Sequence, residues 1–186
     1  MEHAVGGTRT CLYEGAELDT VVDGMVWQAA KFLKGKKRVL IVGILRRGAP
    51  LADLLHDRLV RDFALLNMQV IHLKVKRYGD DLTLLFPDTK LTETAEQALL
   101  DLTDTTVLVV DDVLYQGHSL LVAMEYLVKK HPTEIRAAVL VDRGSCKLPV
   151  KADIVGVKLE IAPSDVIECN VPPYEPEFKI ELLKLN

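Results

Sequence analysis

Apolar and polar positions along this chain fall into blocks that predict strands and helices in turn. Continuous apolar runs at 39–44 and 107–110 are typical of strands that are buried on both faces of a sheet. Apolar positions recur at helical spacing over 17–33, from Gly48 onward, and over 120–128. Because strands alternate with helices, the pattern predicts an α/β fold with a doubly wound, mainly parallel sheet.

Shorter apolar segments complete the predicted sheet. Further strands are predicted at 71–75, 137–141, 153–157 and 178–185. The polar segment that follows the first of these, 77–104, is predicted to be a hairpin or loop. The tail from 160 to 186 contains four prolines and no helical periodicity, so we expect no helix there.

Length and composition are those of an ordinary globular chain. With 186 residues, 49% of them hydrophobic and 27% charged, the chain is long enough for one α/β domain and too short to require two, so a single domain over 1–186 is predicted. No apolar stretch approaches the roughly 20 residues of a membrane helix, and the first residues do not resemble a signal peptide. We therefore expect a cytoplasmic protein without membrane contact.

Charge and cysteine content exclude several classes of site. The formal net charge of -4 disfavours a protein that holds a polyanion by bulk attraction. One dense basic run, at 31–38, reads as an exposed helix end and turn, because Gly35 is a helix stop signal. Three distant cysteines, Cys11, Cys146 and Cys169, give neither a disulfide framework nor a zinc spacing.

The strongest candidate site follows the apolar run at 107–110. Ligands of open α/β sheets gather at the carboxyl ends of the strands, where Asp111 and Asp112 lie and would face hydroxyl groups or a metal. The polar turn at 115–119 leads into a predicted helix, whose free N–H groups attract phosphate. An isolated pair of acids more often solvates a loop. The whole order of strand, acids, turn and helix nevertheless predicts a binding site for a sugar phosphate.

A second unit of strand, basic turn and helix contains Arg46, Arg47 and Gly48. Backbone N–H groups and guanidinium groups at the end of a strand can bind a pyrophosphate. Taken alone, two arginines at a turn are more simply read as exposed side chains. Together with the acid pair after the neighbouring apolar run, they predict a second anion-binding loop.

The segment from 107 to 119, with its Asp-Asp-Val-Leu-Tyr core and following glycine, resembles the phosphoribosyl pyrophosphate (PRPP) motif of the type I phosphoribosyltransferases. Among them it is most similar to the PyrR family of pyrimidine regulators, which are uracil phosphoribosyltransferases. The resemblance implies that the acids hold the ribose hydroxyls and that the turn holds the 5′-phosphate. The nucleotide-binding residues that it implies are Arg46, Arg47, Gly48, Asp111, Asp112, Val113, Leu114, Tyr115, Gln116, Gly117, His118 and Ser119.

The phosphate turn departs from the family pattern. Family members usually carry Thr-Gly-x-Thr where this chain has Gln116, Gly117, His118 and Ser119. Ser119 keeps a hydroxyl group and Gly117 allows close approach of the backbone, whereas Gln116 replaces a compact donor by a longer amide. His118 is either a phosphate ligand whose charge depends on pH or a plain exposed turn histidine.

Three more segments extend the resemblance. The loop at Arg46 and Arg47 resembles the pyrophosphate loop of the family, which implies a non-proline cis peptide bond nearby. Residues from 77 to 104 resemble the mobile loop that closes over PRPP, with Arg77 as a catalytic residue that reaches the pyrophosphate. The family also has a small hood over the base, built from the chain ends, here about 1–15 and 158–186.

The base-binding residues implied by the resemblance are Arg143, Val166 and Ile167. Val141 to Gly144 closely resembles a stretch that is distinctive of PyrR. Enzymes for hypoxanthine and guanine usually have a carboxylate that accepts a proton where this chain has Tyr115. Since tyrosine has a pKa of about 10, it is a poor base at neutral pH, and uracil is the favoured acceptor.

The expected activity is therefore transfer of a phosphoribosyl group from PRPP to uracil, which gives UMP and pyrophosphate. Mg²⁺ is the implied cofactor, held by Asp111 and Asp112 directly or through PRPP hydroxyls, and Asp112 is also expected to act in catalysis. Two alternatives stay open: hypoxanthine or guanine salvage, and a UMP-responsive RNA-binding regulator with weak or no catalysis. The resemblance also implies a homo-oligomer, a dimer or larger.

Overall fold

The computed structural model of the chain describes residues 7–76 and 90–185. Its helices and strands are β1 Gly7–Glu14, α1 Gly15–Leu33, β2 Arg38–Leu45, α2 Gly48–Phe63, β3 Met68–Lys76, β4 Lys90–Thr92, α3 Ala95–Ala98, β5 Thr105–Leu114, α4 His118–Val128, β6 Glu134–Asp142, β7 Ile154–Lys158, β8 Val166–Asn170 and β9 Lys179–Leu185. The strands predicted from apolar runs and the helices predicted from helical spacing are all present, with shifted ends.

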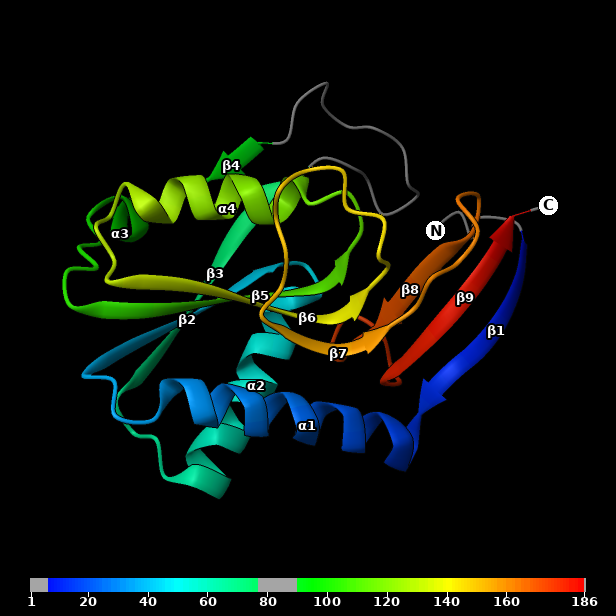
Figure 1. Cartoon of the computed structure of the whole chain (residues 1–186), viewed down its shortest axis with the longest axis horizontal. Coiled ribbons are helices and arrows are strands. Elements are labelled where there is room, and N and C mark those ends of the chain that lie inside the picture. The colour runs from blue at the N-terminus through cyan, green and yellow to red at the C-terminus, as the bar shows by residue number, and fades with distance from the viewer. Residues whose placement is uncertain (1–6, 77–89, 186) are drawn as a thin grey trace.

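The main sheet has six strands in the order β4-β3-β2-β5-β6-β7. Strands β3, β2, β5, β6 and β7 pair in parallel, and only β4 at the edge is antiparallel. Helices α1 and α2 cover one face of this sheet, and α4 covers the other (Figure 1). The predicted α/β fold with a doubly wound, mainly parallel sheet is therefore confirmed.

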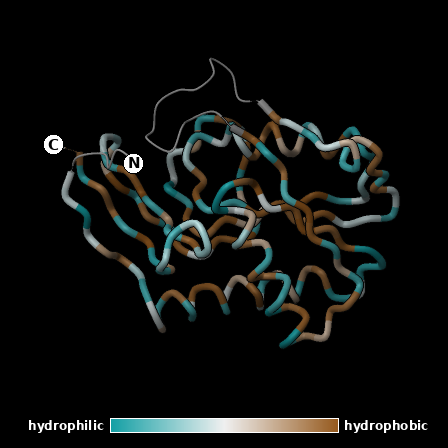
Figure 2. Tube along the Cα trace, turned by 180° about the vertical axis from the view of Figure 1, so that it is seen from behind, coloured by the Kyte–Doolittle hydropathy of each residue, from teal (hydrophilic) through white to brown (hydrophobic). Residues whose placement is uncertain are grey.

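The core is divided by the sheet into two layers. Ile41 and Leu108 face α1 and α2, whereas the next residues along the same strands, Val42 and Val109, face α4. All four side chains are buried, which explains why β2 and β5 are continuous apolar runs rather than alternating ones. Figure 2 shows these central strands as a hydrophobic band through the molecule. Among the described helices, none combines the length and apolar character needed to cross a bilayer.

A second, smaller sheet lies beside the carboxyl end of the main one (Figure 1). Its order is β1-β9-β8, and both pairings are antiparallel. Ile167 and Ile180 of this sheet pack into the same core layer as α1. The sequence predicted β9, whereas β1 and β8 were missed because β1 is largely exposed and β8 is short and lies between prolines.

The predicted hairpin or loop over 77–104 is described only from residue 90 onward, where β4 pairs antiparallel with β3 as the second strand of a hairpin does. The helical turn α3 that follows was not predicted. Thr94 and Gln97 form a capping box, in which the Gln97 N–H donates to Thr94 Oγ1 over 3.2 Å and the Thr94 N–H donates to Gln97 Oε1 over 3.0 Å. The remaining residues of this prediction, 77–89, lie outside the described residues.

Helix α2 packs so closely on β2 that a methyl group at Gly43 has no room. A Cβ there would lie 2.6 Å from Ala49 Cα and 2.9 Å from Ala52 Cβ. We expect Gly43→Ala to lower the free energy of unfolding by about 1–3 kcal/mol, the usual cost of overpacking, and to lower Tm by several degrees. Differential scanning calorimetry measures both.

Gly24 in α1 is the matched control. A Cβ at this position meets nothing within 4 Å, so Gly24→Ala is expected to stabilise the helix by up to about 1 kcal/mol. A Gly43→Ala variant as stable as the parent would contradict the close packing of α2 on β2.

Candidate active site

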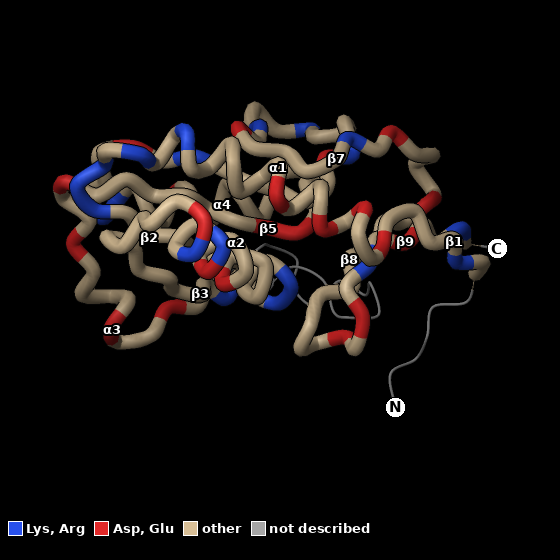
Figure 3. Tube along the Cα trace, turned by 90° about the horizontal axis from the view of Figure 1, so that it is seen from below, with Lys and Arg blue, Asp and Glu red and all other residues tan. Residues whose placement is uncertain are grey.

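Asp111 and Asp112 lie within the last residues of strand β5, rather than after its end. The strand continues through both acids to Leu114, between β2 and β6. Asp111 Oδ1 accepts a hydrogen bond from the Asp112 N–H over 2.9 Å, and Asp112 Oδ1 accepts one from the Val113 N–H over 2.9 Å. Figure 3 shows this acidic stretch beside the β5 label, in the interior of the view. The backbone therefore orients both carboxyl groups.

Burial makes the acid pair costly to ionise. Only 8% of Asp111 is exposed, and burial, followed by the neighbouring charge of Asp112, raises the pKa of Asp111 well above its ordinary value. Burial also raises the pKa of Asp112, although the positive charge of Arg47 opposes this shift. Buried, mutually repelling carboxyl groups at a strand end are typical of a functional site rather than of a solvated loop.

The arginine loop lies directly against the acid pair. Strand β2 ends at Leu45, and α2 begins at Gly48. Because β2 and β5 are parallel neighbours, their carboxyl ends meet at the same edge. A Cβ at Gly48 would lie 2.6 Å from the Val110 carbonyl oxygen and 3.1 Å from Asp111 Oδ1, so only glycine allows this approach. The predicted cis peptide bond is confirmed, and it joins Leu45 to Arg46.

Both arginines of this loop contact the tail of the chain. Arg47 Nε donates a hydrogen bond to Glu175 Oε1 over 3.0 Å, and the Arg46 guanidinium lies 4.8 Å from the centre of the Tyr174 ring. Burial lowers the pKa of Arg47, but Glu175 and the charge of Asp112 more than offset this and raise it above its ordinary value. No sequence signal marks Tyr174 and Glu175, because they are distant from the arginine loop along the chain and belong to no motif.

The predicted phosphate turn connects β5 to α4. Gly117 has a φ of 87° and directly precedes the helix, whose first turn contains His118 and Ser119. The first N–H groups of a helix have no partner within it and attract anions. A Cβ at Gly117 would lie 2.6 Å from Cys146 Sγ, so both the backbone conformation and the close packing call for glycine.

On the other side of the acids, Arg143 connects the phosphate turn to the small sheet. Its guanidinium lies 4.1 Å from the centre of the Tyr115 ring, and its Nη2 donates to the Asp165 carbonyl oxygen over 3.0 Å. Arg143 is 7% exposed, and burial lowers its pKa. Within the described part of the chain, its buried Nε has no hydrogen-bond partner. Val166 begins β8 immediately after Asp165.

Not every predicted site residue presents its side chain to this edge. Leu114 and Ile167 are buried in the core layers, so only their backbone atoms are available to a ligand. Val113 is half-buried and packs against the core. Gln116 is half-buried in the turn itself. Arg77 lies outside the described residues.

The donor set fits a magnesium ion that arrives with a phosphate ligand. Within 7–76 and 90–185, no group of three or more His, Cys, Asp or Glu side chains could hold a metal alone. Asp111 and Asp112 provide two carboxylates on adjacent residues. Mg²⁺ commonly keeps several waters and binds through one or two carboxylates together with substrate phosphates, so this pair is sufficient.

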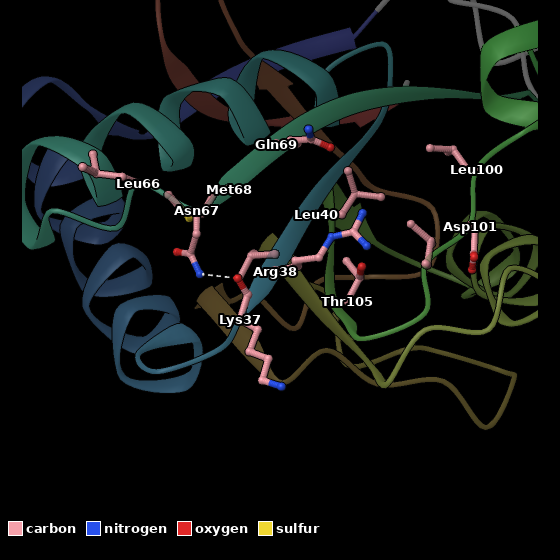
Figure 4. A pocket seen from close by; sticks show the side chains of 12 residues that line it. Lys37, Arg38, Leu40, Leu66, Asn67, Met68, Gln69, Leu100, Asp101 and Thr105 are labelled. Atoms are coloured by element: carbon pink, nitrogen blue, oxygen red, sulfur yellow. Dashed lines mark hydrogen bonds between the residues drawn. The ribbon is translucent and has the colours of Figure 1, made fainter.

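A separate pocket of about 300 Å³ lies at the opposite, amino-terminal edge of the main sheet (Figure 4). Arg38 and Thr105, which begin β2 and β5, contribute to its lining. Asn67 forms one side and donates a hydrogen bond from Nδ2 to the Lys37 carbonyl oxygen over 2.9 Å. The basic run recognised in the sequence thus borders this pocket and takes no part in the site around the acid pair.

The acid pair, the arginine loop and the predicted phosphate turn meet at the carboxyl edge of a parallel sheet, where open α/β enzymes bind their ligands. Residues 12–177 match the phosphoribosyl transferase domain family. The bifunctional protein PyrR of Thermus thermophilus is 36% identical over 150 residues, which are 80% of this chain and 81% of the relative. PyrR of Clostridium acetobutylicum is 32% identical over 153 residues, which are 82% of this chain and 84% of the relative.

A solved structure shows the same fold. The hypoxanthine phosphoribosyltransferase of Trypanosoma cruzi superposes with a TM-score of 0.73 at 18% identity, covering 94% of this chain and 91% of that one. The chain therefore belongs to the type I phosphoribosyltransferases and is a phosphoribosyltransferase enzyme. The resemblance to PyrR that the sequence predicted is confirmed.

The burial of Asp111 predicts that removing its charge stabilises the ligand-free protein. Below the ordinary pKa of 3.8 the carboxyl group is protonated in both the folded and the unfolded chain. As the pH rises above this value, the unfolded chain loses the proton first, so the folded state loses stability. We expect Asp111→Asn to have a higher Tm than the parent at neutral pH, by a few degrees, and a similar Tm near pH 3.5 to 4.

Thermal unfolding followed by circular dichroism across this pH range measures the effect. Asp57→Asn is the control, because the Asp57 side chain is 79% exposed and such substitutions usually change stability little. An Asp111→Asn variant that is less stable than the parent at neutral pH would contradict the account of a desolvated carboxyl group.

Proposed function

We propose that this phosphoribosyltransferase transfers the phosphoribosyl group of PRPP to uracil and releases UMP and pyrophosphate. The observation that supports this most is the packing of Gly48 against Asp111. It places the carboxylates beside the arginine loop, at the edge where the phosphate turn begins. PRPP has a ribose with a phosphate at one end and a pyrophosphate at the other, so it needs carboxylates for the hydroxyl groups and an anion-binding segment on either side of them.

In this proposal the two carboxylates hold the ribose. Asp111 and Asp112 accept hydrogen bonds from the ribose hydroxyl groups, which relieves part of the cost of burying them. The 5′-phosphate binds at the N-terminus of α4, where backbone N–H groups and the Ser119 hydroxyl donate to it. Gln116 and His118 flank this subsite. Because this turn departs from the family pattern, we expect the difference to change the affinity for the 5′-phosphate rather than the cleavage of the bond between the anomeric carbon and pyrophosphate.

The step with the highest barrier is departure of pyrophosphate from the anomeric carbon, which leaves a sugar with positive charge. Arg46 and Arg47 neutralise the leaving pyrophosphate, and Asp112 stabilises the positive sugar through its negative charge. Mg²⁺, when bound with PRPP near Asp111 and Asp112, neutralises phosphate charge. Arg77 is proposed as the lid residue over the pyrophosphate. No covalent bond to the protein is needed, because positioning the base in line supplies the remaining acceleration.

Arg143 and β8 are proposed to bind the base. Arg143 lies between the Tyr115 ring and the residue before Val166, so its guanidinium can donate to a base carbonyl group held beside the backbone of Val166 and Ile167. A phenol is a poor proton acceptor at neutral pH. The purine enzymes of the family usually have a carboxylate as proton acceptor at the Tyr115 position, so this residue favours uracil, whose N1 proton leaves to the departing pyrophosphate or to water as the new bond forms.

A panel of bases tests this proposal. With PRPP and Mg²⁺, we expect UMP to form from uracil, while hypoxanthine and guanine give no nucleotide product above background. Product analysis by chromatography distinguishes the nucleotides. Turnover of hypoxanthine or guanine without turnover of uracil would contradict uracil as the substrate and indicate a purine. No turnover of any base would contradict the proposed activity.

A second candidate function is UMP-dependent binding of RNA. The relatives are named bifunctional proteins, and the sequence resemblance to PyrR implies regulation through messenger RNA. Lys37 and Arg38 are exposed basic residues at the amino-terminal edge of the sheet, away from the acid pair. A gel-shift experiment with a pyrimidine-operon leader RNA tests this second function. A complex that requires UMP and weakens steeply with salt would support RNA binding in addition to catalysis, whereas no UMP-dependent complex would leave catalysis alone.

A further inference from the structure

The tail segment after β8 brings a carboxylate to the arginine loop. Glu175 Oε1 accepts hydrogen bonds from Nε and Nη2 of Arg47, and Glu175 Oε2 accepts one from the Val171 N–H over 2.9 Å. Val171 directly follows β8, the strand proposed to line the base. The Glu175 side chain is only 18% exposed. One carboxylate thus connects the base side of the site to the pyrophosphate side.

Only a carboxylate can make both contacts. A glutamine has one acceptor oxygen and one donor NH₂ group on its terminal amide. If its oxygen faced Arg47, its NH₂ group would face the Val171 N–H, and two donors would oppose each other. The reverse orientation would place the NH₂ group against the Arg47 guanidinium. Glu175→Gln therefore preserves size but disrupts one of the two contacts.

The contacts also leave part of the guanidinium for an anion. Glu175 uses Nε and one hydrogen of Nη2 of Arg47, and in the described residues Nη1 donates no hydrogen bond to a side chain or carbonyl group. An unrestrained arginine side chain loses rotamer entropy when it is ordered by a ligand. Because Glu175 already orders the Arg47 side chain, pyrophosphate binding does not have to order it. Tyr174 holds Arg46 in a similar way, through its ring.

We propose that Glu175 is a positioning residue, which holds the Arg47 guanidinium toward the leaving pyrophosphate and connects the base-lining strand to the arginine loop. This inference rests on the proposed role of Arg47 in the PRPP site. Glu175 itself does not touch the substrate. The competing reading is that its carboxylate occupies Arg47 as an internal anion, which pyrophosphate must displace.

Pyrophosphate binding and steady-state kinetics separate these readings. Isothermal titration of the full chain with pyrophosphate and Mg²⁺ gives Kd, and initial rates give KM for PRPP and for uracil. For Glu175→Gln we expect the Kd for pyrophosphate and the KM for PRPP to rise about tenfold, with a smaller rise in the KM for uracil and a Tm lowered by no more than a few degrees. Glu177→Gln is the matched control, because Glu177 is 71% exposed and pairs only with Lys179 among the described residues.

A double-mutant cycle tests whether Glu175 acts through Arg47. In an Arg47→Ala background, Glu175→Gln should change the Kd for pyrophosphate no further, whereas a general structural role would still weaken binding. Should Glu175→Gln fail to fold, Glu175→Asp keeps both oxygens on a shorter chain and is expected to weaken pyrophosphate binding by a smaller factor.

The outcomes also separate this inference from the proposed function. If the unaltered protein neither binds pyrophosphate nor uses PRPP, the proposed site fails. If it does both and Glu175→Gln binds pyrophosphate as well as the parent, only the role of Glu175 is overturned. Tighter binding by Glu175→Gln overturns it as well, and establishes the carboxylate as a competing internal anion.

Discussion

The close approach of the β2–α2 turn to the end of β5 is the constraint on which the site depends. Gly48 lies against Val110 and Asp111 without room for a methyl group. This contact shields the carboxyl groups from water and places a cationic loop beside them at the same time. Because opposite charges are held near each other by backbone packing, the site is organised before any ligand binds.

The parallel sheet supplies the remaining geometry. Strands β2, β5 and β6 run side by side in one direction, so the arginine loop, the phosphate turn and Arg143 all leave the sheet at its carboxyl edge. The small sheet of β1, β9 and β8 closes this edge from the side (Figure 1). It also packs into the same core layer as α1, which connects β8, the strand proposed to line the base, to the body of the enzyme. The strand proposed to line the base and the helix that follows the arginine loop therefore pack into one core layer.

The sequence predicted those features that depend on local pattern. Apolar runs identified β2 and β5 because both faces of these strands are buried. The motif at Asp111 indicated the carboxyl edge of the sheet, where the acid pair lies against the arginine loop. The sequence did not predict β1, whose residues are mostly exposed and whose pairing with β9 spans nearly the whole chain. It also missed Glu175, because a contact between residues 128 positions apart leaves no periodic signal. Long-range polar contacts require the fold, whereas strands and turns follow from composition and spacing.

A crystal structure of the protein with UMP tests the central claim most directly. The account predicts that the ribose hydroxyls lie within hydrogen-bond distance of the Asp111 and Asp112 carboxylates, with the phosphate against the backbone N–H groups at 117–119. A UMP molecule bound elsewhere, with the acid pair and this turn making no contact to it, would contradict the account.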